Sequence, residues 1–249
     1  MAVAGFTVNA TDATRELMLE NHPFNAREPI PKRTSVLIIG TAPPPRFSTP
    51  RTGENRRRLD FDFFYGSEDN DMWPILEEIA EERDGLKLFQ DDYSSDQCCL
   101  VARSFLERHC LWMSDVLNTY ERKPGKATSA IDTDIVAPKP ENFTDFRAIF
   151  ASCPSLKMIA FTSQQAARWT LNALLQQELM GAFSYSKTLM AWKNSLSEVR
   201  YTRPLLTTSI GQIPVSFFIL PSPSSRSPES YEAKKQVYRA VLFEIKLVT

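Results

Sequence analysis

One segment constrains the fold of this chain more than any other: residues 36–46, with the sequence VLIIGTAPPPR. Four apolar residues, three of them β-branched, stop at a glycine, which predicts a buried parallel strand followed by a tight loop. Gly40 allows close backbone approach, and the prolines prevent a helix from starting directly after the strand. Because ligands bind at such carboxyl ends in open α/β sheets, the loop is expected to line a site. On these residues alone, an ordinary strand end in a proline-rich protein is an equally good interpretation.

Further apolar segments complete the pattern of an α/β domain. Strands are expected at residues 156–162, 203–209 and 215–220, and helices over about residues 71–82, 100–110, 138–150, 163–180 and 227–246. The expected helix caps are Asp71, Ser163, Ser227 (followed by Pro228) and either Asn142 or Thr144. This alternation predicts a three-layer α/β/α sandwich with a central, mainly parallel sheet of four to five strands.

The length of the chain fits one large domain. Its 249 residues are 43% hydrophobic and 24% charged, which is enough for a complete core. Residues 1–34 have the character of an N-terminal extension, in which Thr11-Asp12 is expected to cap a short helix. Residues 35–249 are expected to form a single domain with insertions near residues 46–62, 84–98 and 181–201.

Composition excludes several classes of protein and site. No stretch approaches the roughly 20 apolar residues of a membrane span, and the N-terminus lacks a secretory pattern, so a cytoplasmic protein is expected. The four cysteines contain no Cys-x-x-Cys pair and support neither a zinc site nor an iron–sulfur cluster. His22 and His109 fit no metal or triad pattern and are expected to be structural. No metal site is therefore expected.

Positive charge is concentrated in one segment. The formal net charge is only −1, which argues against a generally basic nucleic-acid-binding protein. Residues 46–58 nevertheless carry five arginines against a single acid, Glu54. Such a local patch can bind phosphates even when the whole chain is nearly neutral. A solvated surface loop is the alternative interpretation of the same run.

Four segments carry motifs that occur in the same order in one known family. They are VLIIGTAP at residues 36–43, FYGSEDNDMWPIL at 64–76, Asp-Val-Leu and Glu-Arg-Lys within 115–123 followed by Ser129, and LPSPS at 220–224. With these segments the chain resembles the uracil-DNA glycosylase superfamily, and most closely its hypoxanthine/uracil-DNA glycosylase branch. The corresponding motifs of that branch are Gly-Ser-x-Pro after a strand, Tyr-Tyr-Gly-x-x-x-Asn-x-x-Trp-x-Ile-Leu, Asp-Val-Leu…Glu-Arg-x-Gly…Ser, and Leu-Pro-Ser-x-Ser.

The resemblance implies a uracil-DNA glycosylase-like fold and a monofunctional DNA glycosylase. Such an enzyme flips a deaminated or modified base out of DNA and hydrolyses its N-glycosidic bond, leaving an abasic site, without a cofactor. Asn70 is then expected to hold the attacking water, with Thr41 as a second catalytic residue; a helix cap is the structural alternative for Asn70. The expected base pocket consists of Ala42, Phe64, Tyr65, Thr162 and Ser163. The expected DNA contacts are Pro43, Arg46, Arg56, Arg57, Arg58, Ser222, Ser224, Ser225 and Arg226.

Two positions depart from the family pattern and bear on the substrate. The chain has Thr162-Ser163 where relatives have Asn-Gly, and residues 225–227 are Ser-Arg-Ser where relatives have Pro-Ala-Asn. A Thr hydroxyl offers one rotating donor in place of a planar amide that can match a base edge. Weak activity on uracil is therefore expected, with better activity on an unusual base, either hypoxanthine-like or a bulky modified cytosine.

Two alternatives stay open at this point. One keeps the chemistry but makes the substrate a hypermodified cytosine of phage DNA, so that the protein acts in antiviral defence. The other is a non-catalytic DNA- or nucleotide-binding module that shares the fold. Under each of these interpretations the partner is a nucleic acid or nucleotide, and a monomer is expected.

Overall fold

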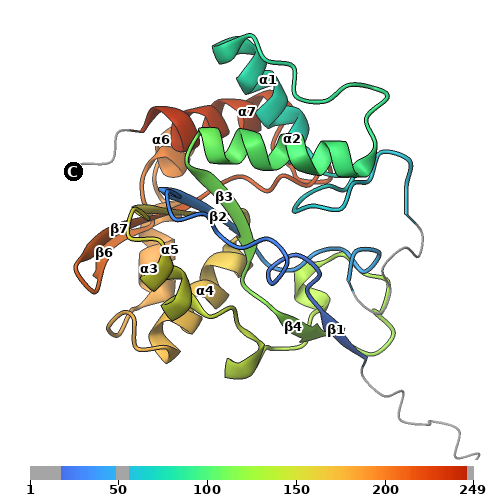
Figure 1. The fold of residues 1–249 in the computed structure, drawn as a ribbon. Helices are drawn as coiled ribbons and strands as arrows, with labels where there is room; N and C mark the ends of the chain where they lie inside the picture. The colour runs from blue at the N-terminus through green and yellow to red at the C-terminus, as the bar shows by residue number, and fades with distance from the viewer. Residues whose placement is uncertain (1–17, 49–55, 246–249) are drawn as a thin grey trace, which may run out of the picture.

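The structure is a computed structural model that describes residues 18–48 and 56–245. Its centre is a five-stranded sheet with the strand order β3-β2-β5-β7-β6 (Figure 1). The strands are β2 (Val36–Gly40), β3 (Leu111–Asp115), β5 (Met158–Phe161), β6 (Leu206–Ile210) and β7 (Ile213–Ile219). Within this sheet four strands are parallel, and the edge strand β6 runs antiparallel to β7. The expected three-layer α/β/α sandwich with a mainly parallel sheet is confirmed.

The pairing register brings the carboxyl ends of the parallel strands to one edge of the sheet. Val36 of β2 lies opposite Leu111 of β3 and Met158 of β5, and Met158 lies opposite Ser216 of β7. The segments that follow β2, β5 and β7 therefore emerge close together, although they are far apart in the sequence. Strands β2, β5 and β7, whose segments the sequence predicts as strands, thus lie side by side.

Helices cover both faces of the sheet (Figure 1). On one face lie α1 (Met72–Asp84), α2 (Ser95–Arg108), α6 (Ser197–Thr202), α7 (Tyr231–Arg239) and the π-helical continuation η3 (Ala240–Glu244). On the other lie α3 (Phe146–Ser152), α4 (Gln164–Gln176) and α5 (Tyr185–Lys193). Two short 3₁₀ turns, η1 (Asp132–Asp134) and η2 (Pro140–Asn142), lie in the connection that leads to α3. Strand β2 is buried along its whole length, as expected for a strand that helices cover on both sides.

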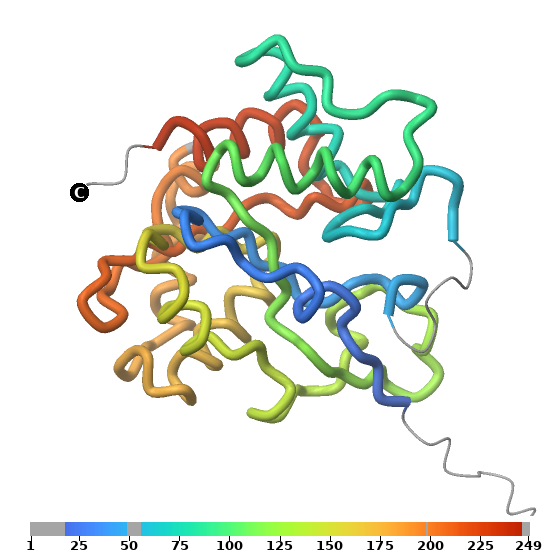
Figure 2. The backbone as a smooth tube through the Cα atoms, viewed as in Figure 1, coloured from blue at the N-terminus to red at the C-terminus, as the bar shows by residue number. Residues whose placement is uncertain are grey.

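The N-terminal region is part of the packed domain from residue 18 onward. Strand β1 (Leu19–Asn21) pairs with β4 (Thr119–Glu121) in a small antiparallel sheet, and Figure 2 shows the chain running on from this dark blue strand across the molecule toward the start of β2. Phe24 is only 2% exposed within the core. The helix expected at Thr11-Asp12 lies outside the described residues.

Aromatic packing fixes the segment that precedes α1. Phe63 and Phe64 are buried and meet edge to face, with ring centroids 5.3 Å apart. The indole nitrogen of Trp73, in the first turn of α1, donates to the Phe64 carbonyl at 2.8 Å. Aromatic side chains bury large areas and prefer such edge-to-face pairs. The start of α1 and the aromatic run are therefore held together, which places Tyr65 at the end of the run.

Strand β3 is an element that the sequence pattern does not predict. Its residues, LWMSD, include no β-branched side chain, and it follows α2 directly after a turn at His109 and Cys110. Cys110 has a positive φ of 54°, which turns the chain sharply. Pairing with β2 makes this segment a strand, because strand formation depends more on the neighbouring strand than on local preference.

Ser163 caps α4 as expected, since its hydroxyl accepts a hydrogen bond from the Ala166 N–H at 3.0 Å. Asp71 is the N-cap residue of α1, as expected, but its side chain makes no capping bond to the helix. The Asp71 carboxylate instead accepts a hydrogen bond from the ammonium group of Lys234 at 2.8 Å. A partner that is distant in the sequence has taken the side chain away from the helix.

The caps expected for α3 and α7 are wrong. Helix α3 is capped by Asp145 rather than Asn142 or Thr144, and α7 by Ser230 rather than Ser227. Several short polar side chains lie near each of these helix starts, and each can bond to local backbone, so the pattern alone does not select one. The helix expected from residue 100 begins earlier, at Ser95. The helix expected to reach residue 180 ends at Gln176, and the strand expected from residue 203 begins at Leu206.

Membrane, thiol and metal features can be reported for the described residues. None of their helices combines the length and the apolarity needed to cross a bilayer. Cys98, Cys99, Cys110 and Cys153 are free thiols. Across residues 18–48 and 56–245, no group of His, Cys, Asp and Glu side chains is arranged to hold a metal ion.

A buried lysine joins α7 to the loops at the sheet edge. Lys234 is only 1% exposed, and its ammonium nitrogen donates to the Asp71 carboxylate at 2.8 Å and to the Ser224 carbonyl at 2.7 Å. A charge can be buried only when it is paired and hydrogen-bonded. This contact therefore fixes the start of α1 against the loop that follows β7.

Replacing Lys234 should destabilise the fold strongly. Lys234→Met removes the ammonium group while keeping similar bulk, and leaves the Ser224 carbonyl and the Asp71 carboxylate without their partner. We expect the free energy of unfolding, measured by urea titration, to fall by about 3 kcal/mol. The matched control is Lys187→Met on the exposed face of α5, with a change under about 0.5 kcal/mol. Equal unfolding midpoints for the two variants would contradict this role.

Candidate active site at the carboxyl ends of the sheet

A cleft of about 790 Å³ opens where β2, β5 and β7 end. Its size is within the range of about 300–1,000 Å³ that is usual for small-molecule and cofactor sites. Most of the residues singled out in the sequence line it: Thr41, Ala42, Pro43, Arg46, Arg57, Phe64, Tyr65, Asn70, Thr162, Ser163, Ser222, Ser224 and Arg226. Arg56, Arg58 and Ser225 are not among its lining residues. Segments from four parts of the chain thus come together, as the parallel sheet requires.

The floor of the cleft depends on the missing side chain of Gly40. A Cβ atom there would lie 2.2 Å from the Asp115 Oδ1 and 2.3 Å from the Tyr65 hydroxyl oxygen. The Tyr65 backbone has a φ of 56°, a conformation that L-residues seldom adopt outside functional or tight segments. Gly40 therefore lets the aromatic run fold back over the end of β2 and place Tyr65 inside the cleft.

Tyr65 is hydrogen-bonded to Thr162, one of the residues expected to line the base pocket. Its hydroxyl lies 3.1 Å from the Thr162 hydroxyl, and Thr162 is itself buried. Burial, together with the nearby Asp115 carboxylate, raises the pKa of Tyr65 well above its usual value, so the hydroxyl is neutral at physiological pH. Thr162 thus supports Tyr65, an arrangement that the sequence pattern gives no means of predicting.

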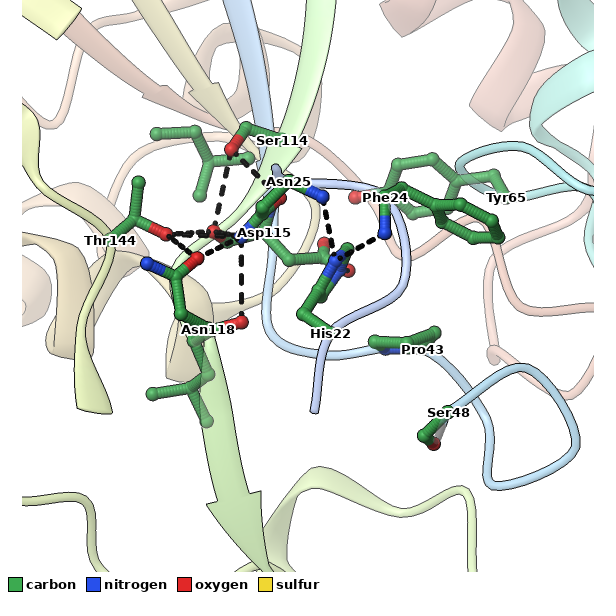
Figure 3. A network of polar contacts seen from close by, with 12 residues as sticks. His22, Phe24, Asn25, Pro43, Ser48, Tyr65, Ser114, Asp115, Asn118 and Thr144 are labelled. Carbon is green, nitrogen blue, oxygen red and sulfur yellow. Dashed lines mark hydrogen bonds and ion pairs between the residues drawn. The ribbon is translucent and has the colours of Figure 1, made fainter. Parts of the chain in front are cut away.

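A second polar network, shown in Figure 3, fixes Asp115 at the end of β3. The Asp115 Oδ2 lies 2.8 Å from His22 Nε2, and His22 Nδ1 accepts hydrogen bonds from the backbone N–H groups of Phe24 and Asn25. Because Nδ1 is an acceptor, the proton of the neutral ring is on Nε2, which donates to Asp115. Asn25 also bonds to both backbone groups of Asp115, at 3.1 and 2.9 Å. Asp115 is 6% exposed and rigidly held.

Asp132 is a cleft residue that the sequence analysis missed. It lies in η1, and its Oδ2 accepts hydrogen bonds from the Thr41 hydroxyl at 2.7 Å and the Ser163 hydroxyl at 3.2 Å. These two donors follow β2 and β5, so the carboxylate bridges two strand ends. Burial raises the pKa of Asp132, and so does the Asp115 carboxylate, whereas the two hydroxyl groups and Arg122 oppose this shift. The only signal in the sequence is its position shortly after Ser129, the last residue of a matched motif.

The loop that carries Asp132 is tied to the loop after β2 by a buried arginine. The Arg122 guanidinium donates to the Ser129 carbonyl at 2.5 Å and to the Pro43 carbonyl at 3.0 Å. Its charge is balanced by Glu20 of β1, at 3.1 Å. The placement of Asp132 therefore depends on β1, a part of the chain expected to be only an extension.

Asn70 faces the cleft and also caps α1. Its Oδ1 accepts a hydrogen bond from the Met72 N–H at 2.9 Å. Among the described residues, its amide nitrogen has no hydrogen-bond partner and remains able to donate. Asn70 also pairs with Ser224 in an isolated antiparallel bridge, which brings the loop before α1 against the loop after β7. Asn70 therefore lies in the cleft, as the site prediction expects, and its side chain also bonds to the start of the helix, as the capping alternative expects.

The loop after β7 presents hydroxyl groups and one unpaired cation. The Ser222 oxygen accepts from the Ser224 N–H, and the Ser224 oxygen accepts from the Arg226 N–H, both at 3.3 Å. Each hydroxyl proton is therefore left to donate to a ligand. Arg226 is exposed, and no acidic side chain in the described part of the chain pairs with it. Oxygen atoms with negative charge are the ligands that such a loop favours.

Three of the described arginines in residues 46–58 are paired with acids of the next segment. Arg46 pairs with Asp60 at 2.7 Å, and Arg57 with Asp69 at 2.5 Å. Arg56 forms an ion pair with Asp62. The positive charge that the composition of this run indicates is therefore reduced in the folded protein.

A second lobe of about 440 Å³ adjoins the cleft. The lobe shares Thr162, Ser163 and Ser222 with the main cleft and is lined farther out by Trp192 and Tyr201. These two aromatic residues come from α5 and α6, within the expected insertion at residues 181–201. The insertion thus adds space beside the site.

Comparisons with known proteins find similarity to solved structures. No protein-family model matches the chain, and no curated protein matches it. The chain is similar to the solution NMR structure of a candidate uracil DNA glycosylase from Methanosarcina acetivorans, with 18% sequence identity and a TM-score of 0.47. The match covers 90% of this chain and 99% of that one. At this identity and score, the similarity assigns neither a family nor an activity.

Replacing Gly40 should disturb the floor of the cleft. In Gly40→Ala the new methyl group would overlap Asp115 and Tyr65, so one of them must move. We expect the free energy of unfolding to fall by about 1–3 kcal/mol, as for other over-packed buried sites. Gly181→Ala is the matched control, because its added methyl group meets no atom within 4 Å. Urea denaturation of both variants tests this, and an unchanged midpoint for Gly40→Ala would show that the site has room to spare.

Proposed function

We propose that the protein is a monofunctional DNA glycosylase that hydrolyses the N-glycosidic bond of a flipped-out base and leaves an abasic site. The observation that carries the proposal is the meeting of two distant motifs in one cleft. Asn70, from the aromatic-Gly-Asn-Trp segment, and Ser222 and Ser224, from the Leu-Pro-Ser loop, lie across the cleft from Thr41. These segments are the ones by which the chain resembles DNA glycosylases.

The chemistry of the lining supports this proposal. An extruded base can stack on Tyr65, and the amide nitrogen of Asn70 can donate to a base oxygen or to the attacking water. The hydroxyl groups of Ser222 and Ser224 and the exposed Arg226 can bind the phosphates that flank the base. No lysine is present among the described lining residues, so hydrolysis is favoured over a mechanism with an amine nucleophile.

A second candidate substrate is a bulky modified base, such as a hypermodified cytosine of phage DNA, which would give the protein a role in antiviral defence. The second lobe favours it, because space continues past Thr162 and Ser163 toward Trp192 and Tyr201. The Thr162 hydroxyl is also hydrogen-bonded to Tyr65, so it is poorly placed to distinguish bases by the hydrogen-bonding groups on their edges. Size would then matter more than hydrogen bonding in substrate choice.

A panel of oligonucleotides tests the proposal. Each duplex or single strand carries one uracil, hypoxanthine, xanthine or modified cytosine, and abasic sites are scored by strand cleavage after alkali. We expect base release from at least one unusual base, slower release of uracil, and no cleavage before alkali. Tight DNA binding without turnover of any base would favour a non-catalytic binding module instead.

Two substitutions at Asn70 separate catalysis from capping. Asn70→Asp keeps an oxygen that can accept from the Met72 N–H but removes the amide donor. We expect base release under single-turnover conditions to fall by about 100-fold or more, with little loss of stability. Asn70→Ala should lose activity and also about 1 kcal/mol of unfolding free energy. Asn194→Ala, at the exposed end of α5, is the control; a wild-type rate for Asn70→Asp would leave Asn70 as a cap alone.

Arg226 and Arg56 should differ in their effect on DNA binding. Arg226 is exposed at the cleft, whereas the Arg56 guanidinium pairs with Asp62 and lies 3.9 Å from the centre of the Phe47 ring. Removing one phosphate contact should reduce the slope of log affinity against log salt concentration by about one unit. We expect that change for Arg226→Ala and a much smaller one for Arg56→Ala, measured by fluorescence anisotropy. Equal changes would mean that the ion pair of Arg56 opens when DNA binds.

A further inference from the structure

The Asp132 carboxylate has one oxygen engaged and one free. Both hydroxyl donors, from Thr41 and Ser163, bond to Oδ2, at 2.7 and 3.2 Å. No hydrogen bond from a described residue reaches Oδ1. Because Asp132 lines the cleft, this second oxygen is an unused acceptor at the point where the ends of β2 and β5 meet. The two hydroxyl bonds hold the carboxylate in one orientation.

The other polar groups of the cleft are less suited to accept a proton. The Asn70 oxygen already accepts from the Met72 N–H, and the rest of its amide can only donate. Asp115 is bonded to His22 through Oδ2, and its Oδ1 lies in the narrow space beside Gly40 and Tyr65. Tyr65 is a neutral phenol. Asp69, the other carboxylate that lines the cleft, is paired with Arg46 and Arg57. Among the described lining residues, Asp132 therefore has the carboxylate oxygen that is left to take up a proton.

We propose that Asp132 is the general base of the reaction and activates the water that attacks the sugar. The inference rests on the proposed glycosylase function. The water oxygen forms a bond to C1′ while the C1′–N bond breaks and its electron pair leaves with the base. The proton of the water passes to Asp132 Oδ1, and the released base later takes up a proton, so the products are the neutral base and an abasic sugar. Asn70 donates to the oxygen atoms of this reaction and does not take the proton.

The groups around Asp132 predict how the rate of base release depends on pH. The groups that face it are the Asp115 carboxylate, the Arg122 guanidinium and the hydroxyls of Thr41 and Ser163. Burial and Asp115 outweigh the opposing groups and raise the pKa of Asp132 above its ordinary range. A general base must be ionised, so the rate should rise with pH through this raised pKa. The acid limb should therefore lie at a higher pH than an exposed aspartate would give.

The test compares Asp132→Asn with Asp134→Asn on the most reactive oligonucleotide of the panel. Asparagine keeps an oxygen for Thr41 and Ser163 but cannot accept the proton. We expect single-turnover base release to fall by about 100-fold or more, with DNA affinity within about twofold of wild type and the acid limb abolished. Asp134 lies on the same turn, outside the cleft, where it accepts from the Ser129 hydroxyl at 2.7 Å. Its variant should keep wild-type turnover.

Stability distinguishes a catalytic role from a structural one. Because the folded protein holds the Asp132 proton more tightly than the unfolded chain, ionisation of this group weakens the fold as the pH rises through the raised pKa. Asp132→Asn should therefore be no less stable than wild type at pH 7 in urea titration. A lower midpoint together with lost DNA binding would overturn the proposal in favour of a structural role.

The remaining outcomes also decide between the two proposals. Wild-type turnover by Asp132→Asn, with an unchanged acid limb, would overturn the role of Asp132 while leaving the glycosylase function standing. Absence of base release by the wild-type protein on every oligonucleotide would overturn the glycosylase function and, with it, the role of Asp132.

Discussion

Parallel pairing of β2, β5 and β7 is the constraint on which the rest of this molecule depends. The register places Gly40, Phe161 and Ile219 at one edge of the sheet, so the loops that follow share one space. Helices on both faces bury β2 and β5 completely and the second half of β7 almost completely, which leaves the edge as the place where polar groups can gather. Gly40 then sets the depth of the cleft, because the missing side chain is where Asp115 and Tyr65 approach.

Two buried cations hold the loops at the edge of the sheet in place. Lys234 fixes the loop before α1 against the loop after β7, and Arg122 fixes the loop after β2 against the turn that carries Asp132. Each cation is bonded to backbone carbonyls as well as to an acid, which offsets the cost of removing its charge from water. The walls of the cleft are thus rigid, although they consist of loops.

The distribution of charge separates two tasks. The cleft contains the carboxylates of Asp115 and Asp132, whereas Arg46, Arg56 and Arg57 are paired with acids of the following segment. An acidic interior repels phosphate and suits a group that must take up a proton. Under the proposed function, the Leu-Pro-Ser loop and Arg226 at the rim would bind the DNA backbone. In that proposal Asn70 donates and Asp132 accepts, and the proposed chemistry involves neither a metal ion nor a cofactor.

The sequence determined the strands β2, β5, β6 and β7 and the strand ends that line the cleft. It did so because an apolar run ending in glycine and proline, as at residues 36–46, has few structural solutions. The motifs by which the chain resembles DNA glycosylases pointed to Asn70, Tyr65 and Ser222, which line the cleft, and local capping preference placed Ser163 at the start of α4.

Tertiary structure decided the rest. Strand β3 exists because β2 offers it a partner, and Asp71 is drawn away from its helix by Lys234, which is far away in the sequence. Asp132 enters the site only because Arg122 and the hydroxyls of Thr41 and Ser163 hold its loop there. Hydrophobic periodicity and capping preferences reflect interactions between residues that are close together in the sequence. The pairing of buried charges and polar groups depends on distances that exist only once the chain has folded.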